Sequence, residues 1–211
     1  MAHRRLIHTI LGCGMTVGML VTAAATRQPP LPLTIGSGKL TIIGSSNVHE
    51  WEASTTAVRV IGARLSPQSA GAAPWSEIVK PGALATFEIA VAAGTLKSNR
   101  DGLDKNMYKA LKTAEHKDIT FRLTRLETAA APGALLAVGK LTIAGVEREI
   151  TFQMETQLQG ASLLVRGTVP LVMTEFGIAP PKAMLGMLKT DPNVKVIFEV
   201  LLSAADAAGI H

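Results

Sequence analysis

The stretch ITFRLT at residues 119–124 alternates apolar and polar side chains one by one, and the stretch ITFQME at residues 150–155 does the same. Successive side chains of a β-strand point to opposite faces. Each stretch therefore places one set of side chains on a buried face and the other set in water. The two stretches predict half-buried strands in an all-β domain.

Six further segments carry a strand signal, and Gly, Pro or Asn residues separate many of them. These segments are residues 40–44, 58–65, 84–91, 135–143, 163–172 and 194–202. The connection at residues 144–146 is too short for a helical crossover, so the strands on either side of it must pair antiparallel. About eight antiparallel strands form either a closed barrel or a two-sheet sandwich, and alternation alone does not choose between them.

Two segments interrupt the strand pattern. Between residues 103 and 114, apolar side chains recur at helical spacing with lysines between them. This pattern predicts a short amphipathic helix, with Asp101 near its start to satisfy free backbone amides. A second apolar cluster at residues 183–188 follows two prolines and predicts a short helix or an ordered lid before the last strand.

The N-terminus has the features of a secretory signal peptide. Arg4 and Arg5 precede an apolar run at residues 10–21, and small residues lead to Ala25. We expect cleavage near Ala25 and a periplasmic or secreted protein. The run is shorter than the roughly 20 apolar residues that span a bilayer, so no transmembrane span is expected in the mature chain. The only cysteine, Cys13, lies in the segment to be removed; a lipoprotein anchored through Cys13 is the alternative.

Composition and motifs argue against several function classes. Without Arg4 and Arg5, 19 basic residues face 16 acidic ones, and aromatic residues make up only 4% of the chain. A nucleic-acid partner is not expected, because neither a phosphate-neutralising patch nor a stacking platform is visible. The chain has no nucleophile-elbow or phosphate-loop motif and no metal-ligand spacing of histidines, so we expect neither an enzyme nor a metal site.

Four segments resemble the YceI-like polyisoprenoid-binding family. They are TLKSNRDGL at residues 95–103, HKDITF at 116–121, GKLTIAGVEREI at 139–150 and MTEFGI at 173–178. The resemblance covers residues 40–202. It implies a lipocalin-like antiparallel eight-stranded β-barrel with one or two short helices, exported to the periplasm, with an isoprenoid chain in its apolar interior. One departure is Lys117 after His116, where the family often has proline.

This resemblance completes the domain division. Residues 1–25 would be the signal peptide, 26–38 a linker, 39–204 the YceI-like lipid-binding β-barrel domain, and 205–211 a C-terminal tail. The expected partner is an isoprenoid or other long-chain lipid, polyprenyl or quinone-like, with no further cofactor. The role would be that of a non-catalytic carrier or sequestering protein, and a homodimer remains an open arrangement.

Alternation and the resemblance together select candidate site residues. An eight-stranded barrel can hold one small ligand, and each buried methylene group contributes about 0.8 kcal/mol. His49 and Arg100 are candidates for a polar head-group contact. The side chains expected to line the apolar cavity are Phe121, Leu123, Leu141, Ile143, Phe152, Met154, Val196 and Phe198, with Met184, Leu185 and Leu188 closing one end.

Two other functions remain as alternatives. A barrel with a packed interior would act through its outer surface in a stress or adhesion role, and would have an exposed apolar patch and no internal void. An enzyme acting on a small apolar substrate would use His49 or His116 as acid or base. That function requires the histidine to face the cavity with an orienting partner.

Overall fold

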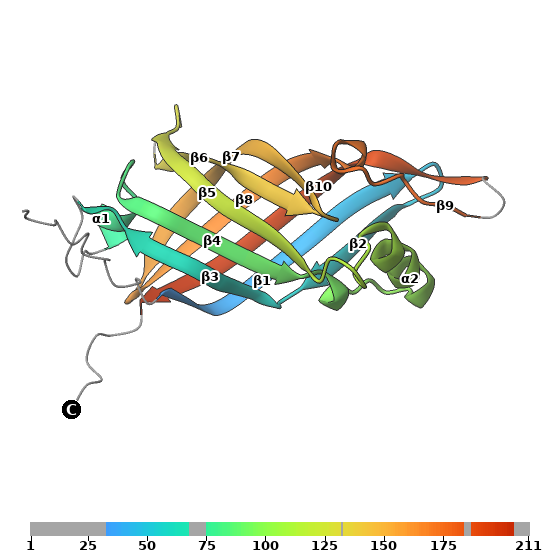
Figure 1. Ribbon diagram of the computed structural model, residues 1–211, viewed down its shortest axis with the longest axis horizontal. Helices are drawn as coiled ribbons and strands as arrows, with labels where there is room; N and C mark the ends of the chain where they lie inside the picture. Colours follow the sequence, from blue (N-terminus) through green and yellow to red (C-terminus); the bar gives the residue numbers. More distant parts are fainter. Residues whose placement is uncertain (1–32, 68–74, 132, 184–186, 205–211) are drawn as a thin grey trace, which may run out of the picture.

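The computed structural model describes residues 33–67, 75–131, 133–183 and 187–204. These residues form one antiparallel sheet that curls on itself (Figure 1). The strand order is β2-β1-β10-β8-β7-β6-β5-β4-β3, and β9 pairs with the start of β10. The strands are β1 (Leu33–Ser46), β2 (Glu50–Thr55), β3 (Val58–Leu65), β4 (Leu84–Ala92), β5 (Asp118–Thr128), β6 (Ala134–Ile143), β7 (Val146–Gln159), β8 (Ser162–Val172), β9 (Lys182–Ala183) and β10 (Leu188–Ala204). The predicted all-β, lipocalin-like fold class is confirmed.

The path through the sheet has nine strands rather than the eight expected, because β2 was not predicted. Only Trp51 and Ala53 give β2 an apolar inward face, and two glutamates flank Trp51. Its pairing with β1, in which Gly44 lies opposite Trp51, makes it a strand. A short, polar edge strand of this kind carries little alternation signal.

The domain also begins earlier than the predicted boundary at residue 39. β1 starts at Leu33, and Gly38 lies opposite Val200 of β10. Residues 33–38, which were assigned to the linker, form part of a paired strand that has an irregularity between Ile35 and Ser37. A side chain at Gly38 would crowd Ile35, because its Cβ would lie 3.2 Å from Cγ2 of Ile35, while β3 passes on the same side with Val58 at 3.6 Å.

The two edges of the sheet meet without a continuous ladder. At one end of the molecule, the first half of β1 is adjacent to β3. At the other end, Ser54 of β2 and Lys97 exchange two backbone hydrogen bonds of 2.8 and 2.9 Å. The hydroxyls of Thr55 and Thr95 lie 2.6 Å apart beside this bridge. These contacts cover an edge that would otherwise expose unpaired backbone groups.

Two short α-helices lie near opposite ends of the curled sheet (Figure 1). α2 (Asp101–Ala110) is the predicted amphipathic helix, but its N-cap is Arg100 and no side chain caps it, so the expected role of Asp101 is wrong. α1 (Trp75–Ile78) was not predicted. In the apolar cluster at 183–188, Ala183 and Leu188 are strand rather than helix, because they pair antiparallel, and residues 184–186 lie outside the described residues. In the described ranges, no helix is long and apolar enough to cross a membrane.

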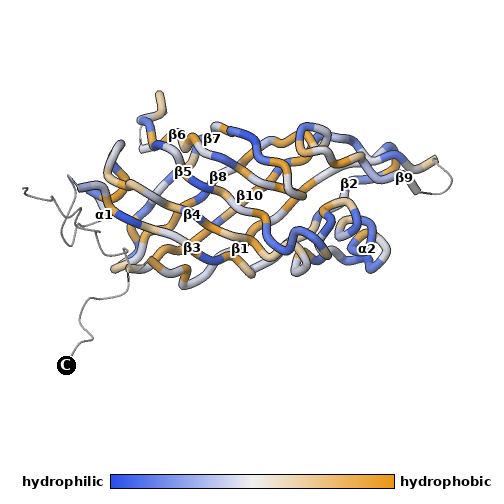
Figure 2. The backbone as a smooth tube through the Cα atoms, viewed as in Figure 1, coloured by the Kyte–Doolittle hydropathy of each residue, from blue (hydrophilic) through white to orange (hydrophobic). Residues whose placement is uncertain are grey.

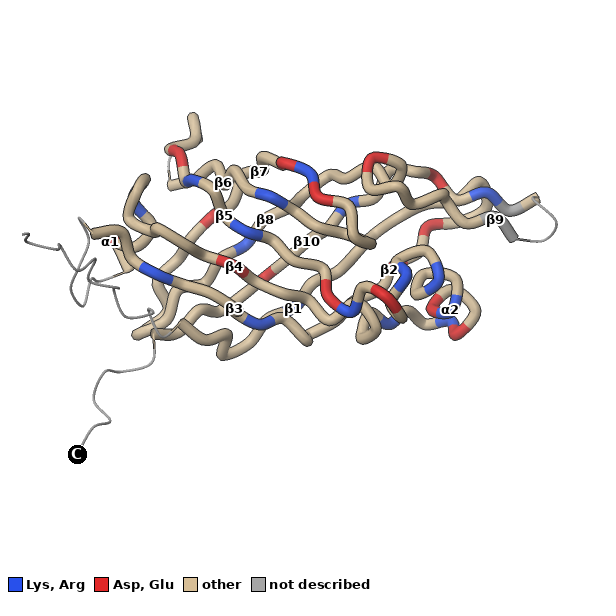
Figure 3. The backbone as a smooth tube through the Cα atoms, in the orientation of Figure 1, with Lys and Arg blue, Asp and Glu red and all other residues tan. Residues whose placement is uncertain are grey.

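Apolar and polar residues alternate along the strands (Figure 2), as expected for a sheet with one face inward and the other in water. Basic and acidic residues are interspersed along the strands and around α2 (Figure 3). Several pair across neighbouring strands, including Arg166 with Glu199 at 3.0 Å and Lys140 with Glu147 at 2.9 Å. Such exposed pairs contribute little stability, roughly 0–1 kcal/mol each.

Candidate functional site

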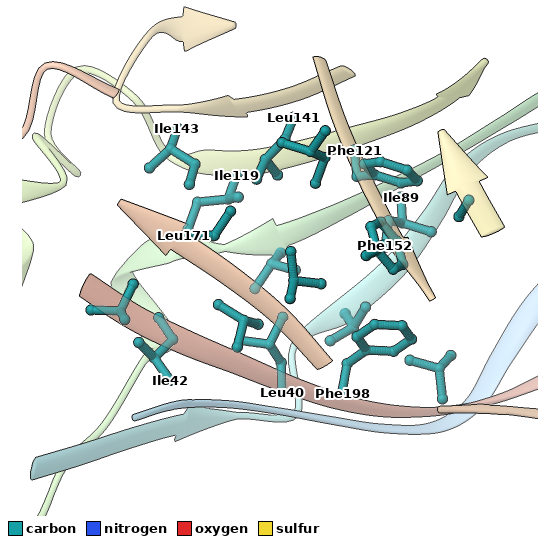
Figure 4. Close-up of a pocket in the computed structure, with 18 of the residues that line it drawn as sticks. Leu40, Ile42, Ile89, Ile119, Phe121, Leu141, Ile143, Phe152, Leu171 and Phe198 are labelled. Carbon is teal, nitrogen blue, oxygen red and sulfur yellow. The ribbon is translucent and has the colours of Figure 1, made fainter. Parts of the chain in front are cut away.

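The curled sheet wraps around a partly open cavity of about 430 Å³ that runs from α1 to α2. Its wall is almost wholly apolar, and Figure 4 shows aliphatic and aromatic side chains from many strands converging on it. The labelled residues are Leu40, Ile42, Ile89, Ile119, Phe121, Leu141, Ile143, Phe152, Leu171 and Phe198. A volume of this size lies within the range of small-molecule sites.

Eight of the strand residues predicted for the cavity lie on its wall. They are Phe121, Leu123, Leu141, Ile143, Phe152, Met154, Val196 and Phe198. Alternation predicts which side chains face inward, because an inward side chain at one strand position fixes the direction of every second neighbour. Met184 and Leu185, predicted to close one end, lie outside the described residues. Leu188 begins β10.

The polar side chains of the wall gather at the α2 end. Among the described lining residues, five of the six polar ones lie there: Ser46, His49, Arg100, Asn106 and Thr190. Nη1 of Arg100 lies 2.8 Å from Nε2 of His49. Because a guanidinium can only donate, Nε2 of His49 is the acceptor of this hydrogen bond. The predicted head-group residues are thus brought together at one end of the cavity.

A shallower polar recess adjoins this end. Its volume is about 240 Å³, and it is lined by Ile43, His49, Glu50, Trp51, Glu52, Asn99, Arg100 and Leu103. The cavity and the recess share four lining residues, which are His49, Trp51, Arg100 and Leu103. Arg100 therefore lies between an apolar interior and a polar surface, which is where the head group of an amphipathic guest would be solvated.

Asp104 anchors α2 over this end of the barrel. Its side chain is buried, and Oδ1 accepts hydrogen bonds from the backbone N–H of Ser98 at 2.8 Å and from its hydroxyl at 2.7 Å. Nζ of Lys97 lies 3.3 Å from Oδ2. The Ser98 hydroxyl, its N–H and Lys97 hold the pKa of the Asp104 carboxyl below its ordinary value. The hydrogen bond to Asp104 in turn raises the pKa of Lys97.

The opposite end is closed by apolar packing. Trp75 and Ile78 of α1 are buried against Leu163 and Leu202, and all four line the cavity. Nε1 of Trp75 donates a 2.8 Å hydrogen bond to the carbonyl oxygen of Ala161, in the turn between β7 and β8. This contact joins segments 86 residues apart and fixes α1 across the end of the barrel.

Sequence reasoning missed the contributions of both helices to the wall. Leu103, Met107 and Leu111 line the cavity from α2 and the turn after it, and Trp75 lines it from α1. The helical spacing of the α2 residues identified an apolar face, but not the surface that this face covers. His116 is not on the wall; its ring lies against Gly145.

The described residues contain no cluster of three or more His, Cys, Asp or Glu side chains that could hold a metal ion. Neither histidine considered for acid–base chemistry has a hydrogen-bonded carboxylate among the described contacts, and His49 instead contacts the guanidinium of Arg100. The site is a cavity with apolar walls and a small polar end.

Comparisons with known proteins agree with this architecture. A model of the YceI-like domain matches residues 62–202. Similar solved structures include BcnA from Burkholderia cenocepacia, at 13% identity and a TM-score of 0.61, covering 79% of this chain and 96% of that one. A second is a polyisoprenoid binding domain from Saccharophagus degradans implicated in plant cell wall breakdown, at 14% identity and a TM-score of 0.59, covering 83% and 99%.

Both structural neighbours share the fold of this chain over nearly their whole length. No curated protein matches the sequence. The family model covers two thirds of the chain, including all strands from β4 to β8, the second half of β3 and most of β10. The chain therefore belongs to the family of YceI-like domains.

Proposed function

We propose that this protein is an exported, non-catalytic carrier or sequestering protein that holds a long apolar lipid of the isoprenoid type, polyprenyl or quinone-like, inside its barrel. The observation that carries the proposal is the continuous apolar cavity, whose polar lining residues gather at the α2 end. A lipid with one polar head and a long chain has the same distribution of polarity. The chain would lie toward α1, with the head group near His49 and Arg100.

The energetics of such a guest favour binding without many polar contacts. Ten buried methylene groups contribute about 8 kcal/mol, which corresponds to about micromolar affinity before ordering costs are subtracted. The similarity to a structure named as a polyisoprenoid binding domain supports this lipid class. The packed-interior alternative is disfavoured, since it requires a barrel without an internal void, whereas the curled sheet of this chain lines a partly open cavity of about 430 Å³.

Export is supported by the N-terminal sequence alone. The basic start, the apolar run and the small residues before Ala25 are typical of a secretory signal peptide. The mass and N-terminal sequence of the protein, recovered from the periplasmic and extracellular fractions of an exporting host, would test this. A chain beginning near residue 26 supports export with cleavage. A full-length chain confined to the cytoplasm would contradict it.

Native mass spectrometry of the mature protein, followed by solvent extraction, tests lipid binding. The expected result is a stoichiometric mass increment whose extract contains a prenyl lipid or quinone. If the protein is purified empty, incubation with solanesol should produce the increment. An apo mass that persists after incubation would overturn the proposal. Lysozyme taken through the same incubation and extraction serves as the control for lipid carried along nonspecifically.

A further inference from the structure

Three phenylalanine rings and two glycines form a regular pattern across the middle of the barrel wall. Phe121 lies on β5, Phe152 on β7 and Phe198 on β10. Gly139 of β6 and Gly167 of β8 lie on the strands between them. Five adjacent strands therefore present phenylalanine and glycine in turn toward the cavity.

The rings form one connected layer. The ring centroids of Phe121 and Phe152 are 5.3 Å apart in a tilted arrangement, and those of Phe152 and Phe198 are 5.7 Å apart, edge to face. These are favourable geometries for aromatic pairs. Figure 4 shows the three rings on the same side of the view. Phe198 packs against the apolar clusters at both ends of the barrel, so this layer marks the midpoint of the cavity.

Each outer ring occupies the space that a side chain on the neighbouring glycine would need. A Cβ at Gly167 would lie 2.5 Å from Cζ of Phe198, its direct cross-strand partner. A Cβ at Gly139 would lie 2.5 Å from Cζ of Phe121. Both distances are far below the 3.5–4.0 Å at which carbon atoms pack well. The missing side chains thus leave recesses that the outer edges of the two rings occupy.

We propose that Gly139 and Gly167 set the width of the cavity at its midpoint, and thereby determine how far a bound lipid chain extends toward α1. A side chain at either glycine would push a phenylalanine ring off the wall. The ring would then project into the cavity, because the neighbouring strands occupy the space along the wall. The α1 half of the cavity would become inaccessible to the chain. This inference rests on the proposed function, since the guest is the same apolar lipid.

Gly167→Ala is the more specific of the two substitutions, because it mainly affects a phenylalanine ring. The new methyl group at position 167 would mainly meet the far end of the Phe198 ring, with Gln153 O at 3.1 Å, whereas a methyl group at 139 would also lie 2.5 Å from the backbone oxygen of Arg122. Gly62→Ala is the matched control. Gly62 also lies in a strand, the nearest neighbour of its Cβ would be Cβ of Glu88 at 3.8 Å, and it does not line the cavity.

The test is a binding series with isoprenoid alcohols of increasing length, from geraniol through geranylgeraniol to solanesol. Wild type and Gly62→Ala should bind more tightly as the chain lengthens, until the cavity is full. Gly167→Ala should bind geraniol as wild type does and the longest alcohols about tenfold more weakly, which corresponds to about 1.4 kcal/mol. A length profile of Gly167→Ala identical to that of wild type would overturn the inference.

Two further measurements keep the inference separate from folding defects and from the proposed function. Phe198→Leu should shift the length preference toward longer chains, and in the Gly167→Ala background it should restore binding of the long alcohols. If wild type binds no alcohol at all, the proposed function fails. In that case, a crystal structure of Gly167→Ala tests the role of Gly167 separately. The inference predicts that the Phe198 ring projects into the cavity, and a ring that stays against the wall would contradict the inference.

Discussion

The guanidinium of Arg100 and the imidazole of His49 lie 2.8 Å apart at the α2 end of the cavity, where an apolar wall meets a polar recess. Arg100 stands at the N-cap of α2, and His49 lies just before β2. The pair thus joins the helix to the edge of the sheet. Arg100 has further N–H donors with which it could bind the oxygen of a head group without releasing His49.

Replacing Arg100 with methionine should weaken only the binding of lipids with a polar head. Arg100→Met keeps an apolar stem but removes the donors, so an isoprenoid alcohol should bind about three- to tenfold more weakly, as expected for one hydrogen bond of about 0.5–1.5 kcal/mol. Squalene, which has no head group, should bind equally to both proteins. Titrations of wild type and of Arg100→Met with each of the two lipids measure the affinities. Arg64→Met is the control, because Arg64 is exposed on β3 and does not line the cavity. Equal weakening for both lipids would contradict the assignment.

Acidification should loosen the attachment of α2. The folded-state pKa of Asp104 is lowered, first by the Ser98 hydroxyl. Its stabilising contribution is therefore present above the ordinary carboxyl pKa and is lost as the pH falls through the lowered value. Asp104→Asn should lower the Tm at neutral pH, and the difference from wild type should shrink in strongly acidic buffer. Thermal unfolding across this pH range measures the effect. Asp101→Asn, an exposed site on the same helix, should follow wild type.

The strands that line the cavity could be predicted because their inward side chains are large and apolar at every second position. Residues 119–124 and 150–155 have this pattern without interruption. β2 could not be predicted in the same way, since Trp51 is its only large inward side chain. The sequence pattern did not predict α1, because the position of this helix depends on the hydrogen bond from Trp75 to Ala161, far along the chain.

The alternation pattern could not predict that the interior contains an open cavity. Alternation identifies inward side chains, but the same residues could fill a packed core. What keeps the interior open depends on contacts between strands, such as the ring of Phe198 lying in the recess at Gly167. His49 and Arg100 meet only because the sheet brings residues 51 positions apart to the same end.

Leu96 should be a purely structural residue. Its side chain is fully buried, with 0% exposure, yet it does not line the cavity. Leu96→Ala should lower the free energy of unfolding by about 2–5 kcal/mol, as large-to-small core substitutions do, while the folded protein binds lipid as before. Urea denaturation and lipid titration measure the two effects. Leu158→Ala, at a side chain that is 60% exposed, should change stability by less than about 0.5 kcal/mol. Weakened lipid binding by folded Leu96→Ala would show that the core and cavity are coupled.

The contact between His116 and Gly145 should affect stability but not lipid binding. Gly145 has φ +82° in the turn between β6 and β7, and a Cβ there would lie 2.6 Å from Cε1 of His116. Gly145→Ala should cost about 1–2 kcal/mol for the left-handed backbone, with a further cost for displacing the ring. Gly160→Ala, at φ +60° with no neighbour within 4 Å, should show the backbone cost alone. In a His116→Ala background, Gly145→Ala should therefore cost no more than Gly160→Ala, as measured by urea denaturation.

Because His116 is not on the cavity wall, His116→Ala should bind isoprenoid alcohols like wild type. A loss of binding in that variant would instead place the imidazole at the site and revive the acid–base alternative.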